Sequence, residues 1–352
     1  MRKEQIISAD SHFAIKDDML FRHLAERYRQ PILDIREAEE KAASARGRRL
    51  YDDAKWPAFG RAGEWDPHER LKDMDTDQVG AEVLYPSPAA GGPFYALPDG
   101  GRLAAFHAFN NAAIDFAGAD QKRLFPVYLV PVADVREAVG EVQRLAAAGA
   151  RALMLPLHPD DMGFKHYWDP SWDPLWEAAQ ETGIPLSLHL GANSHLLNLV
   201  RHDPTPNRGI FRSLVALDMG ESVATWCMSG LLERFPRLKI ILVEAGLGWI
   251  PYFLERMDTE VKRLRWGKDV LPEAPSFYWH RNMAATFEED EFGVANRGII
   301  GVDNLMWGSD YPHPDSTWPE SRKVIDHHFK DVPEAEMLKM VGGNAMLVYG
   351  LN

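Results

Sequence analysis

Two residues that can bind a metal lie two positions apart in an apolar stretch near the start of the chain. Asp10 and His12 stand in QIISADSHFAI, which is expected to form a β-strand. Because side chains at positions i and i+2 of a strand point to the same side, the pair would bring a carboxylate oxygen and an imidazole nitrogen toward one point. Such a pair supplies half of a metal site, although an isolated Asp-x-His motif also occurs as a capping aspartate beside a core histidine.

Polar residues of the same kind end three other apolar runs. His189 ends the run PLSLHLG, Glu244 ends ILVEAG and Asp310 ends MWGSDYPH, with His313 just beyond it. Each of these runs is too apolar to be a solvated surface. A lone histidine in such a run is more often a hydrogen-bonded core residue, but several ligand-type residues at comparable positions favour a metal site.

Two histidines and two carboxylates form a mixed nitrogen and oxygen ligand set that suits a borderline or hard divalent cation. We therefore expect a divalent metal ion, Zn or Mn, bound by Asp10, His12, His189 and Asp310. For Glu244 two roles stay open, because a carboxylate at this position could be catalytic or could form a structural ion pair with an arginine such as Arg256.

The elements expected to position these residues alternate between strands and helices. After the first strand, the strand-like runs are VGAEVLYPS, LFPVYLVPV, ARALMLP, PLSLHLG, LKIILVEAG, FYWHRNMAATF and LMWGSDYPH, separated by helical segments such as ERLKDMDTDQ and DVREAVGEVQRLAAAG. About eight strands in this order predict an α/β fold, a (β/α)8 TIM-like barrel formed by a single domain over residues 1–352. In such a barrel the carboxyl ends of the strands meet at one mouth, where catalytic sites are built.

A polar stretch between about residues 16 and 68 follows the first strand and has no regular strand pattern. It is expected to be an insertion after strand 1. Because it mixes Trp56, Phe59 and Trp65 with many charged residues, we expect it to cover the mouth or to join a subunit interface. A homodimer is the expected assembly.

Composition limits the possible partners. The chain has 39 basic and 52 acidic residues and a formal net charge of -13, which repels nucleic acid and anionic membrane surfaces. No segment approaches the ~18 uninterrupted apolar residues that a membrane span needs. The single cysteine, Cys227, excludes an internal disulfide framework and favours a reducing, cytoplasmic location. A small-molecule substrate is therefore expected.

Several motifs resemble one known family. DSHFAI, LHLG, VEAGLGWIPYFLERMD, WGSDYPHPDSTWPES and VGGNAMLVYG resemble the amidohydrolase-related group that includes aminocarboxymuconate-semialdehyde decarboxylase and the resorcylate decarboxylases. The resemblance spans nearly the whole chain. It implies a metal-dependent hydrolase-type barrel in which the metal ligands correspond to Asp10, His12, His189 and Asp310.

Two features qualify this resemblance. The decarboxylases that the chain resembles carry a histidine where this chain has Glu244, and a charged glutamate beside a substrate carboxylate is unfavourable. The dinuclear amidohydrolases place a bridging lysine on the fourth strand, whereas ALMLP has none. The first feature weakens the decarboxylase interpretation, and the second favours one metal over two.

Three functions follow as hypotheses. The leading one is a metal-dependent hydrolase that cleaves a small aromatic or ring-opened carboxylic compound, with Glu244 orienting the water and Asp310 transferring the proton. The alternatives are a non-oxidative decarboxylase of an aromatic or muconate-type acid, in which Asp310 protonates the ring carbon, and a non-catalytic ligand-binding barrel. The expected catalytic residues are Asp310, Glu244 and His189, and the expected substrate-binding residues are His313, Phe13, Tyr85, Trp249 and Tyr311.

Overall fold

The strands of the protein form a parallel barrel. The computed structural model describes residues 6–45, 57–58, 60–86, 90–97, 100–191, 203–205, 209–314 and 316–351. Within these residues the strands are β1 (Ile7–Phe13), β2 (Ala81–Pro86), β3 (Leu124–Pro126), β4 (Tyr128–Leu129), β5 (Leu153–Leu155), β6 (Leu186–His189), β7 (Ile240–Val243), β8 (Met283–Phe287) and β9 (Leu305–Trp307). All neighbouring pairs are parallel, in the orders β1-β2-β3 and β4-β5-β6-β7-β8-β9.

Short links join the two sheets into a (β/α)8 arrangement. On one side only Val127 separates β3 from β4, so the predicted strand LFPVYLVPV is a single strand with one interruption. On the other side the chain after β9 bonds to β1, because the Asp310 amide donates to the Asp10 carbonyl at 2.9 Å. Gly308 permits this approach, since a Cβ at that position would lie 2.4 Å from the Cβ of Asp10. The predicted barrel fold is confirmed.

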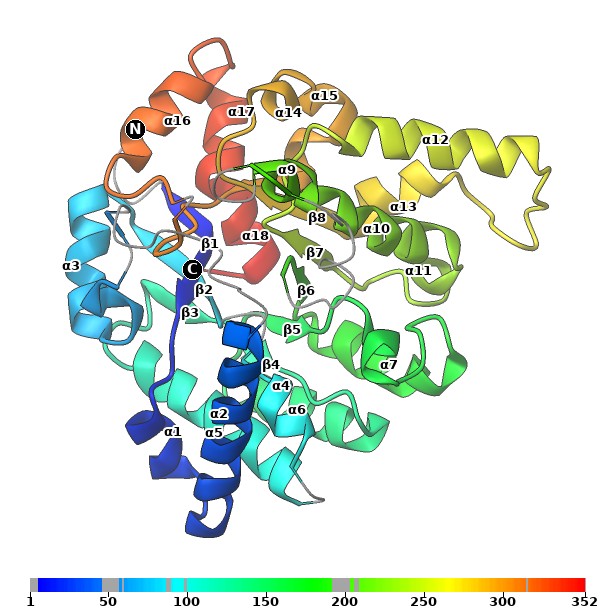
Figure 1. Cartoon of the computed structure of the whole chain (residues 1–352). Coiled ribbons are helices and arrows are strands. Elements are labelled where there is room, and N and C mark those ends of the chain that lie inside the picture. Colours follow the sequence, from blue (N-terminus) through cyan, green and yellow to red (C-terminus); the bar gives the residue numbers. More distant parts are fainter. Residues whose placement is uncertain are drawn as a thin grey trace.

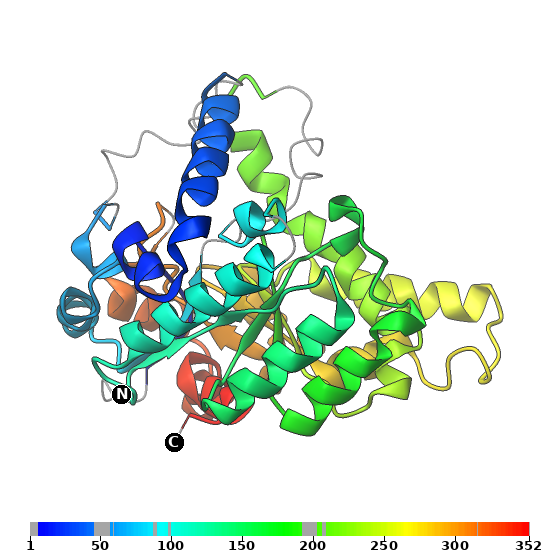
Figure 2. The same ribbon diagram turned by 90° about the horizontal axis from the view of Figure 1, so that it is seen from below.

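Helices surround the strands, as the views from the front and from below show (Figures 1 and 2). Their bounds are α1 (Asp17–His23), α2 (Arg29–Ala45), α3 (Pro67–Asp77), α4 (Gly92–Tyr95), α5 (Gly101–Ala117), α6 (Val135–Ala147), α7 (Asp173–Thr182), α9 (Gly209–Leu214), α10 (Met219–Met228), α11 (Leu231–Arg234), α12 (Ile250–Arg263), α13 (Pro275–Asn282), α14 (Glu291–Ala295), α15 (Arg297–Ile300), α16 (Ser321–His328), α17 (Glu334–Leu338) and α18 (Asn344–Tyr349). Among the described residues, none of these helices has the length and apolar character to cross a membrane.

Local sequence explains the start of the predicted helix DVREAVGEVQRLAAAG. Asp134 caps α6 by accepting hydrogen bonds from the amides of Arg136 and Glu137, which have no partner inside the helix. Another expectation was wrong in part, because the first half of FYWHRNMAATF forms α13 and only Met283–Phe287 forms a strand. Pro275 occupies the first turn of α13, where its missing N–H costs nothing, and the aromatic residues of this segment pack as a helix.

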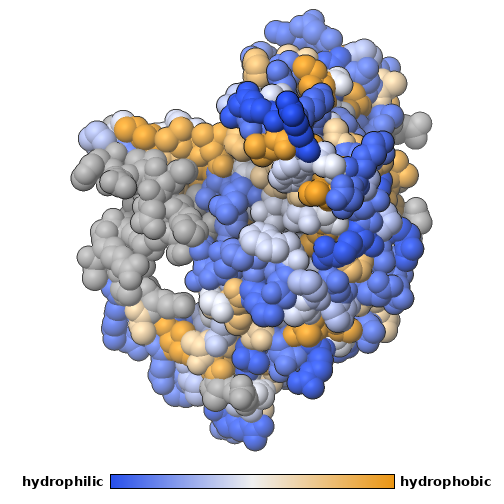
Figure 3. Space-filling model, turned by 90° about the vertical axis from the view of Figure 1, so that its right-hand side faces the viewer, coloured by the Kyte–Doolittle hydropathy of each residue, from blue (hydrophilic) through white to orange (hydrophobic). Residues whose placement is uncertain are grey.

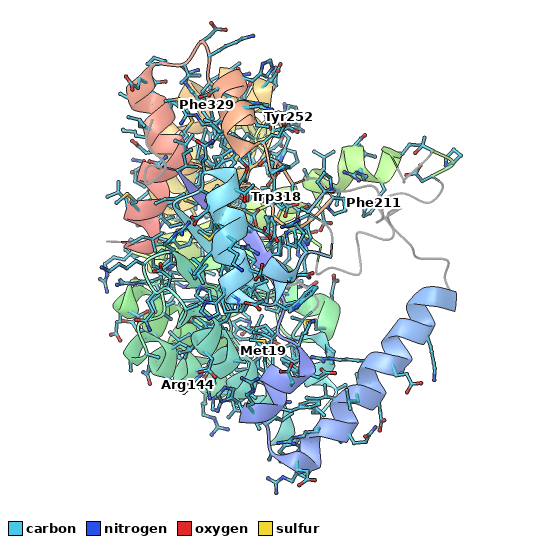
Figure 4. All side chains as sticks on the ribbon, turned by 90° about the vertical axis from the view of Figure 1, so that its left-hand side faces the viewer. Met19, Arg144, Phe211, Tyr252, Trp318 and Phe329 are labelled. Atoms are coloured by element: carbon cyan, nitrogen blue, oxygen red, sulfur yellow. The ribbon has the colours of Figure 1, made fainter. Side chains whose placement is uncertain are left out.

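The stretch after strand 1 contains α1 and α2 rather than only irregular chain. Helix α2 projects from the barrel on the same side as α9, away from the main body (Figures 2 and 4). Trp56 and Phe59 lie outside the described residues. Trp65 is half-buried, and the ammonium group of Lys16 lies 3.6 Å from the centre of its ring.

Candidate metal centre

The four predicted ligands meet at the carboxyl end of the barrel, although they come from three different strands or the segments after them. Asp10 and His12 lie on β1, His189 ends β6, and Asp310 follows β9. All four side chains are buried. His12 Nε2 lies 3.2 Å from an Asp310 oxygen and 3.7 Å from Asp10 Oδ1, and His189 Nε2 lies 3.7 Å from the same Asp10 oxygen. The structure thus brings the four predicted ligands together.

The atoms that face one another in this cluster lack hydrogen bonds. Asp10 Oδ1, His12 Nε2, His189 Nε2 and Asp310 Oδ2 are buried without a hydrogen-bond partner, although they lie close together. Asp310 Oδ1 forms ion-pair contacts with His12 Nε2 and His313 Nδ1 but no hydrogen bond of normal geometry. Buried polar atoms almost always have a partner, and leaving one unpaired costs about 1–3 kcal/mol. Oxygen and nitrogen atoms spaced in this way have the arrangement that a divalent cation needs. The residues present therefore fit the predicted metal ion.

Hydrogen bonds behind the cluster orient two of its members. His189 Nδ1 donates to the Leu190 carbonyl at 2.6 Å, which leaves the Nε2 lone pair free to bind a cation. Asp10 Oδ2 accepts a hydrogen bond of 3.0 Å from the Thr286 hydroxyl, so Oδ1 faces the cluster. The same hydroxyl oxygen accepts from the Glu244 amide at 2.8 Å. Thr286 thus connects β8 to one ligand and to the catalytic candidate on the neighbouring strand.

The protonation states in the cluster suit metal binding. Burial, together with the neighbouring His313, lowers the pKa of His12 to about 4, so its ring is neutral near pH 7. Burial acts to raise the pKa of Asp310, but the charge of His313 and the nearby His12 outweigh it and hold that pKa well below its usual value. A neutral imidazole and an ionised carboxylate are the forms that coordinate metals.

Glu244 lies immediately after β7 and faces the cluster. One of its carboxylate oxygens is 3.9 Å from His189 Nδ1, and its side chain is 28% exposed. Burial of the carboxyl group raises its pKa well above the usual value, and the negative charge of Asp310 raises it further. Arg256 forms its ion pair with Glu260 at 2.8 Å, so the pairing of Glu244 with Arg256 is wrong.

His313 places a positive charge beside Asp310. Its Nδ1 atom is 2.8 Å from an Asp310 oxygen, and its ring centre is 3.9 Å from that of His12. Burial acts to lower the pKa of His313, but the carboxylate of Asp310 outweighs it and raises the pKa to about 9. His313 is therefore a cation near neutral pH, and its side chain is 37% exposed. This position keeps it a candidate for contact with a substrate anion.

Three of the predicted substrate-binding aromatic residues lie in the core. Phe13 packs against the rings of α5. The Tyr85 hydroxyl is hydrogen-bonded to Ser187 and Tyr349, and the Tyr311 hydroxyl donates to a carboxylate of α3. Each of the three is at most 2% exposed, so none offers a surface to substrate in this structure. Trp249 is half-buried, and its indole N–H donates to the Ala245 carbonyl.

Sequence reasoning missed two carboxyl groups near the cluster. Glu288 follows β8, and its Oε1 atom is buried without a hydrogen-bond partner; burial raises its pKa, and the charges of Asp10 and Asp310 add to the effect. Glu64 belongs to the short helix η4 (Ala62–Glu64); burial raises the pKa of its carboxyl group, and the positive charge of His313 acts in the opposite direction. The end of an apolar strand was a usable signal for Glu288, whereas nothing in the sequence placed Glu64 near the mouth.

The chain is similar to several known proteins. The chain is 23% identical over 296 residues to a 2-amino-3-carboxymuconate-6-semialdehyde decarboxylase from Dictyostelium discoideum, covering 82% of this chain and 77% of the relative. An amidohydrolase structure from Mycobacterium avium subsp. paratuberculosis matches with a TM-score of 0.75 at 21% identity, covering 98% of this chain and 99% of the other. A 5-carboxyvanillate decarboxylase from Novosphingobium aromaticivorans, complexed with manganese and 4-hydroxy-3-methoxy-5-nitrobenzoic acid, matches with a TM-score of 0.74 at 18% identity, covering 99% and 97%.

A parallel barrel with histidine and aspartate side chains gathered at the ends of its strands is typical of metal-binding barrel enzymes. The chain belongs to the amidohydrolase family, whose pattern matches residues 17–351, and it is an enzyme of this family.

Proposed function

We propose that the protein is a metal-dependent, non-oxidative decarboxylase of an aromatic or muconate-type carboxylic acid. The observation that carries the proposal is the cluster of Asp10, His12, His189 and Asp310, whose facing atoms are buried and unpartnered. Two of the similar proteins are named as decarboxylases, and one of these binds manganese. We therefore prefer the decarboxylase alternative to the hydrolase that the sequence favoured.

The raised pKa of Glu244 removes the main objection to decarboxylation. The sequence suggested that a charged Glu244 would repel a substrate carboxylate, but the raised pKa of this group supports a neutral carboxylic acid. A neutral acid at this position can also donate a proton. Asp310, in contrast, is one of the proposed metal ligands and its pKa is lowered, so we assign proton donation to Glu244 rather than to Asp310.

The residues of the chain then have distinct tasks. A divalent ion held by Asp10, His12, His189 and Asp310 would supply a positive charge that binds and polarises the substrate oxygens. The His313 cation adds positive charge beside Asp310 and attracts the acid. As the carbon–carbon bond breaks, its electron pair stays on the substrate carbon and CO₂ leaves. Glu244 donates a proton to that carbon, becomes ionised and regains a proton from solvent.

Metal analysis and CO₂ detection test this proposal together. Protein purified without chelator is expected to contain about one Mn or Zn per chain and to release CO₂ from some members of a panel of hydroxylated benzoic acids and muconate-type acids. Removing the metal should abolish release, and adding Mn²⁺ or Zn²⁺ should restore it. A metal-loaded protein that releases no CO₂ from the panel would contradict the decarboxylase assignment.

Hydrolysis is the second candidate, and the presence of Glu244 is the observation that favours it. A glutamate side chain can orient a water molecule, and the hydrolytic reaction would require its ionised form to deprotonate that water. Lactones and amides of the same aromatic acids distinguish the two reactions, because a hydrolase would open them without releasing CO₂. The non-catalytic alternative is not retained, because the facing ligand atoms are not hydrogen-bonded to one another.

We also propose a homodimer of single-domain, cytoplasmic subunits. Exposed apolar side chains on α12, α14 and α15 support an association surface, namely Tyr252, Phe292 and Ile299. The face around α12 and α13 is largely hydrophilic, with several separate apolar patches (Figure 3). Sedimentation velocity would test the assembly, and a single monomer boundary at micromolar concentration would contradict it.

A cytoplasmic location is supported by Cys227, which is buried and forms no disulfide; cell fractionation would test it.

A further inference from the structure

We propose that Arg70 is a positioning residue that sets the geometry of the metal ligands from outside the barrel. The inference rests on the metal centre of the proposed function. Arg70 belongs to α3, which also carries Asp73 and Asp77 on the same face, because residues spaced by three and four positions align along a helix. All three are buried, with exposed fractions of 0%, 4% and 3%. Fully buried charged residues are rare and need specific partners.

Arg70 connects α3 to two strands of the barrel. Its Nε donates to a carboxylate oxygen of Glu82 on β2 at 2.5 Å, and its Nη1 donates to the backbone carbonyl of His12 on β1 at 2.7 Å. Nη1 also lies 3.2 Å from the Gly63 carbonyl of η4. The guanidinium group of Arg70 therefore fixes the backbone carbonyl of His12, a predicted metal ligand.

The same group also holds the segment after β9. The Arg70 guanidinium lies 4.2 Å from the centre of the Tyr311 ring, within the range of a cation–π contact. The Tyr311 hydroxyl donates to Asp73 at 2.5 Å, so α3 contacts this tyrosine twice. Tyr311 directly follows Asp310, and its carbonyl accepts a hydrogen bond from the His12 amide at 2.5 Å. His12 is thus held by Tyr311 at its N–H and by Arg70 at its C=O.

Stability alone does not account for this arrangement. Replacing a buried ion pair by apolar residues is often neutral or stabilising, because removing two charges from water is expensive. The Nη2 atom of Arg70 is in addition buried without a hydrogen-bond partner, which adds a further cost. Arg70 instead fixes the orientation of the His12 carbonyl and the Tyr311 ring. Residues that orient metal ligands without touching the metal affect the affinity for the metal.

Metal affinity measured without turnover tests this role. We would determine the dissociation constant for Mn²⁺ by equilibrium dialysis and record the visible spectrum of the Co²⁺-loaded protein. The variants are Arg70→Lys, Arg70→Met and the double variant Arg70→Met with Glu82→Gln, which leaves no unpaired charge on β2. The matched control is Arg144→Met, because Arg144 forms a paired contact with the buried Glu141 on α6, away from the mouth.

We expect the double variant to stay folded and to bind Mn²⁺ roughly 10- to 100-fold more weakly, the usual loss when a group behind a ligand is removed. Its Co²⁺ spectrum should shift, Arg70→Lys should recover part of the affinity, and Arg144→Met should bind as the wild type does. Wild-type affinity and spectrum in a folded double variant would overturn the inference. Equal weakening by Arg144→Met would do the same, since it would reflect general destabilisation. A wild-type protein that binds no Mn²⁺ or Co²⁺ would instead contradict the metal centre itself.

Discussion

Glu244 and Asp310 share an uncommon backbone conformation at the scale of single residues. Their φ angles are +57° and +52°, in the left-handed region that residues other than glycine rarely adopt. Each conformation costs on the order of 1 kcal/mol or more and persists only where its surroundings impose it. The Thr286 hydroxyl fixes the Glu244 amide, and the Asp10 carbonyl fixes the Asp310 amide. Both side chains are thereby turned toward the metal cluster.

Replacing Glu244 by glutamine tests its role in proton transfer. Glutamine keeps the size of the side chain but cannot donate an acidic proton. Turnover should therefore fall by roughly two to four powers of ten, the usual contribution of a positioned acid or base. Metal content and melting temperature should hardly change. Steady-state CO₂ release and metal analysis provide the measurements.

Two further variants accompany this test. Glu244→His restores a group that carries a proton, so it should recover part of the lost CO₂ release. Glu260→Gln is the matched control, because Glu260 pairs with Arg256 on α12. Unchanged turnover in Glu244→Gln would remove Glu244 from the mechanism.

His189→Ala tests the metal cluster directly. The substitution removes the Nε2 atom that faces Asp10 Oδ1, so metal affinity should fall by more than the roughly 10- to 100-fold that follows loss of a supporting group. Bound metal per chain should be measured by elemental analysis after dialysis. The control is His107→Ala, because His107 pairs with Glu141 away from the cluster. Full metal content in His189→Ala would show that the ligand assignment is wrong.

At the scale of elements, β8 supports the site through one hydroxyl group. Thr286→Val keeps the shape of the side chain but removes the hydrogen bond to Asp10 and the acceptor for the Glu244 amide. We expect metal affinity to fall roughly 10- to 100-fold. Thr286→Ser keeps the hydroxyl and should bind metal nearly as the wild type does. Isothermal titration with Mn²⁺ distinguishes the two, and equal affinities for the valine and serine variants would contradict the role of the hydroxyl.

The strand ends that carry the ligands were predictable because buried parallel strands appear as short apolar runs, and a polar residue at the end of such a run is conspicuous. The expectation that Phe13 binds substrate was wrong, although the direction of its side chain follows from the strand. Phe13 adjoins His12 on β1, and successive strand residues point to opposite faces, so Phe13 faces α5 when His12 faces the mouth.

The strand predicted over the residues of α13 was wrong for a different reason. Its aromatic residues favour strands in isolation, whereas packing decides their structure.

Supporting contacts could not be predicted from spacing. Arg70 and His12 lie 58 positions apart, and Thr286 and Asp10 lie 276 positions apart. No periodicity in the sequence links such residues, because each contact depends on how the complete barrel folds. The ionisation of Glu244 was likewise hidden, since the pKa of a carboxyl group depends on its burial and on neighbouring charges.

At the scale of the whole molecule, α3 and α16 are joined by a buried carboxyl group. Asp77 accepts hydrogen bonds from the backbone amide and the hydroxyl of Ser321 at 2.9 and 2.5 Å. Burial raises the pKa of Asp77 to about 7, above its value in the unfolded chain. The folded protein therefore binds more protons than the unfolded one between pH ~4 and ~7, and stability from this group falls as the pH rises through that window.

Asp77→Asn should remove this pH dependence. We expect the wild type to lose stability relative to the variant between pH 5 and pH 8, with no further relative change at higher pH. Urea unfolding of both proteins at several pH values measures the difference in free energy. Parallel pH profiles for the two proteins would contradict the raised pKa. Asp326→Asn on α16 is a suitable control, because Asp326 pairs with Arg322 at the surface.

The bond between the Asp10 carbonyl and the Asp310 amide has a consequence for biogenesis. The first and the last strand each supply ligands, so a nascent chain still lacking Asp310 cannot form the complete set. We therefore expect complete metal binding only after the segment that carries Asp310 has been synthesised. A cation bound across this junction would hold the two ends of the barrel together. Because it would bind the folded state, the stability of the protein would increase with the concentration of free metal in the cell.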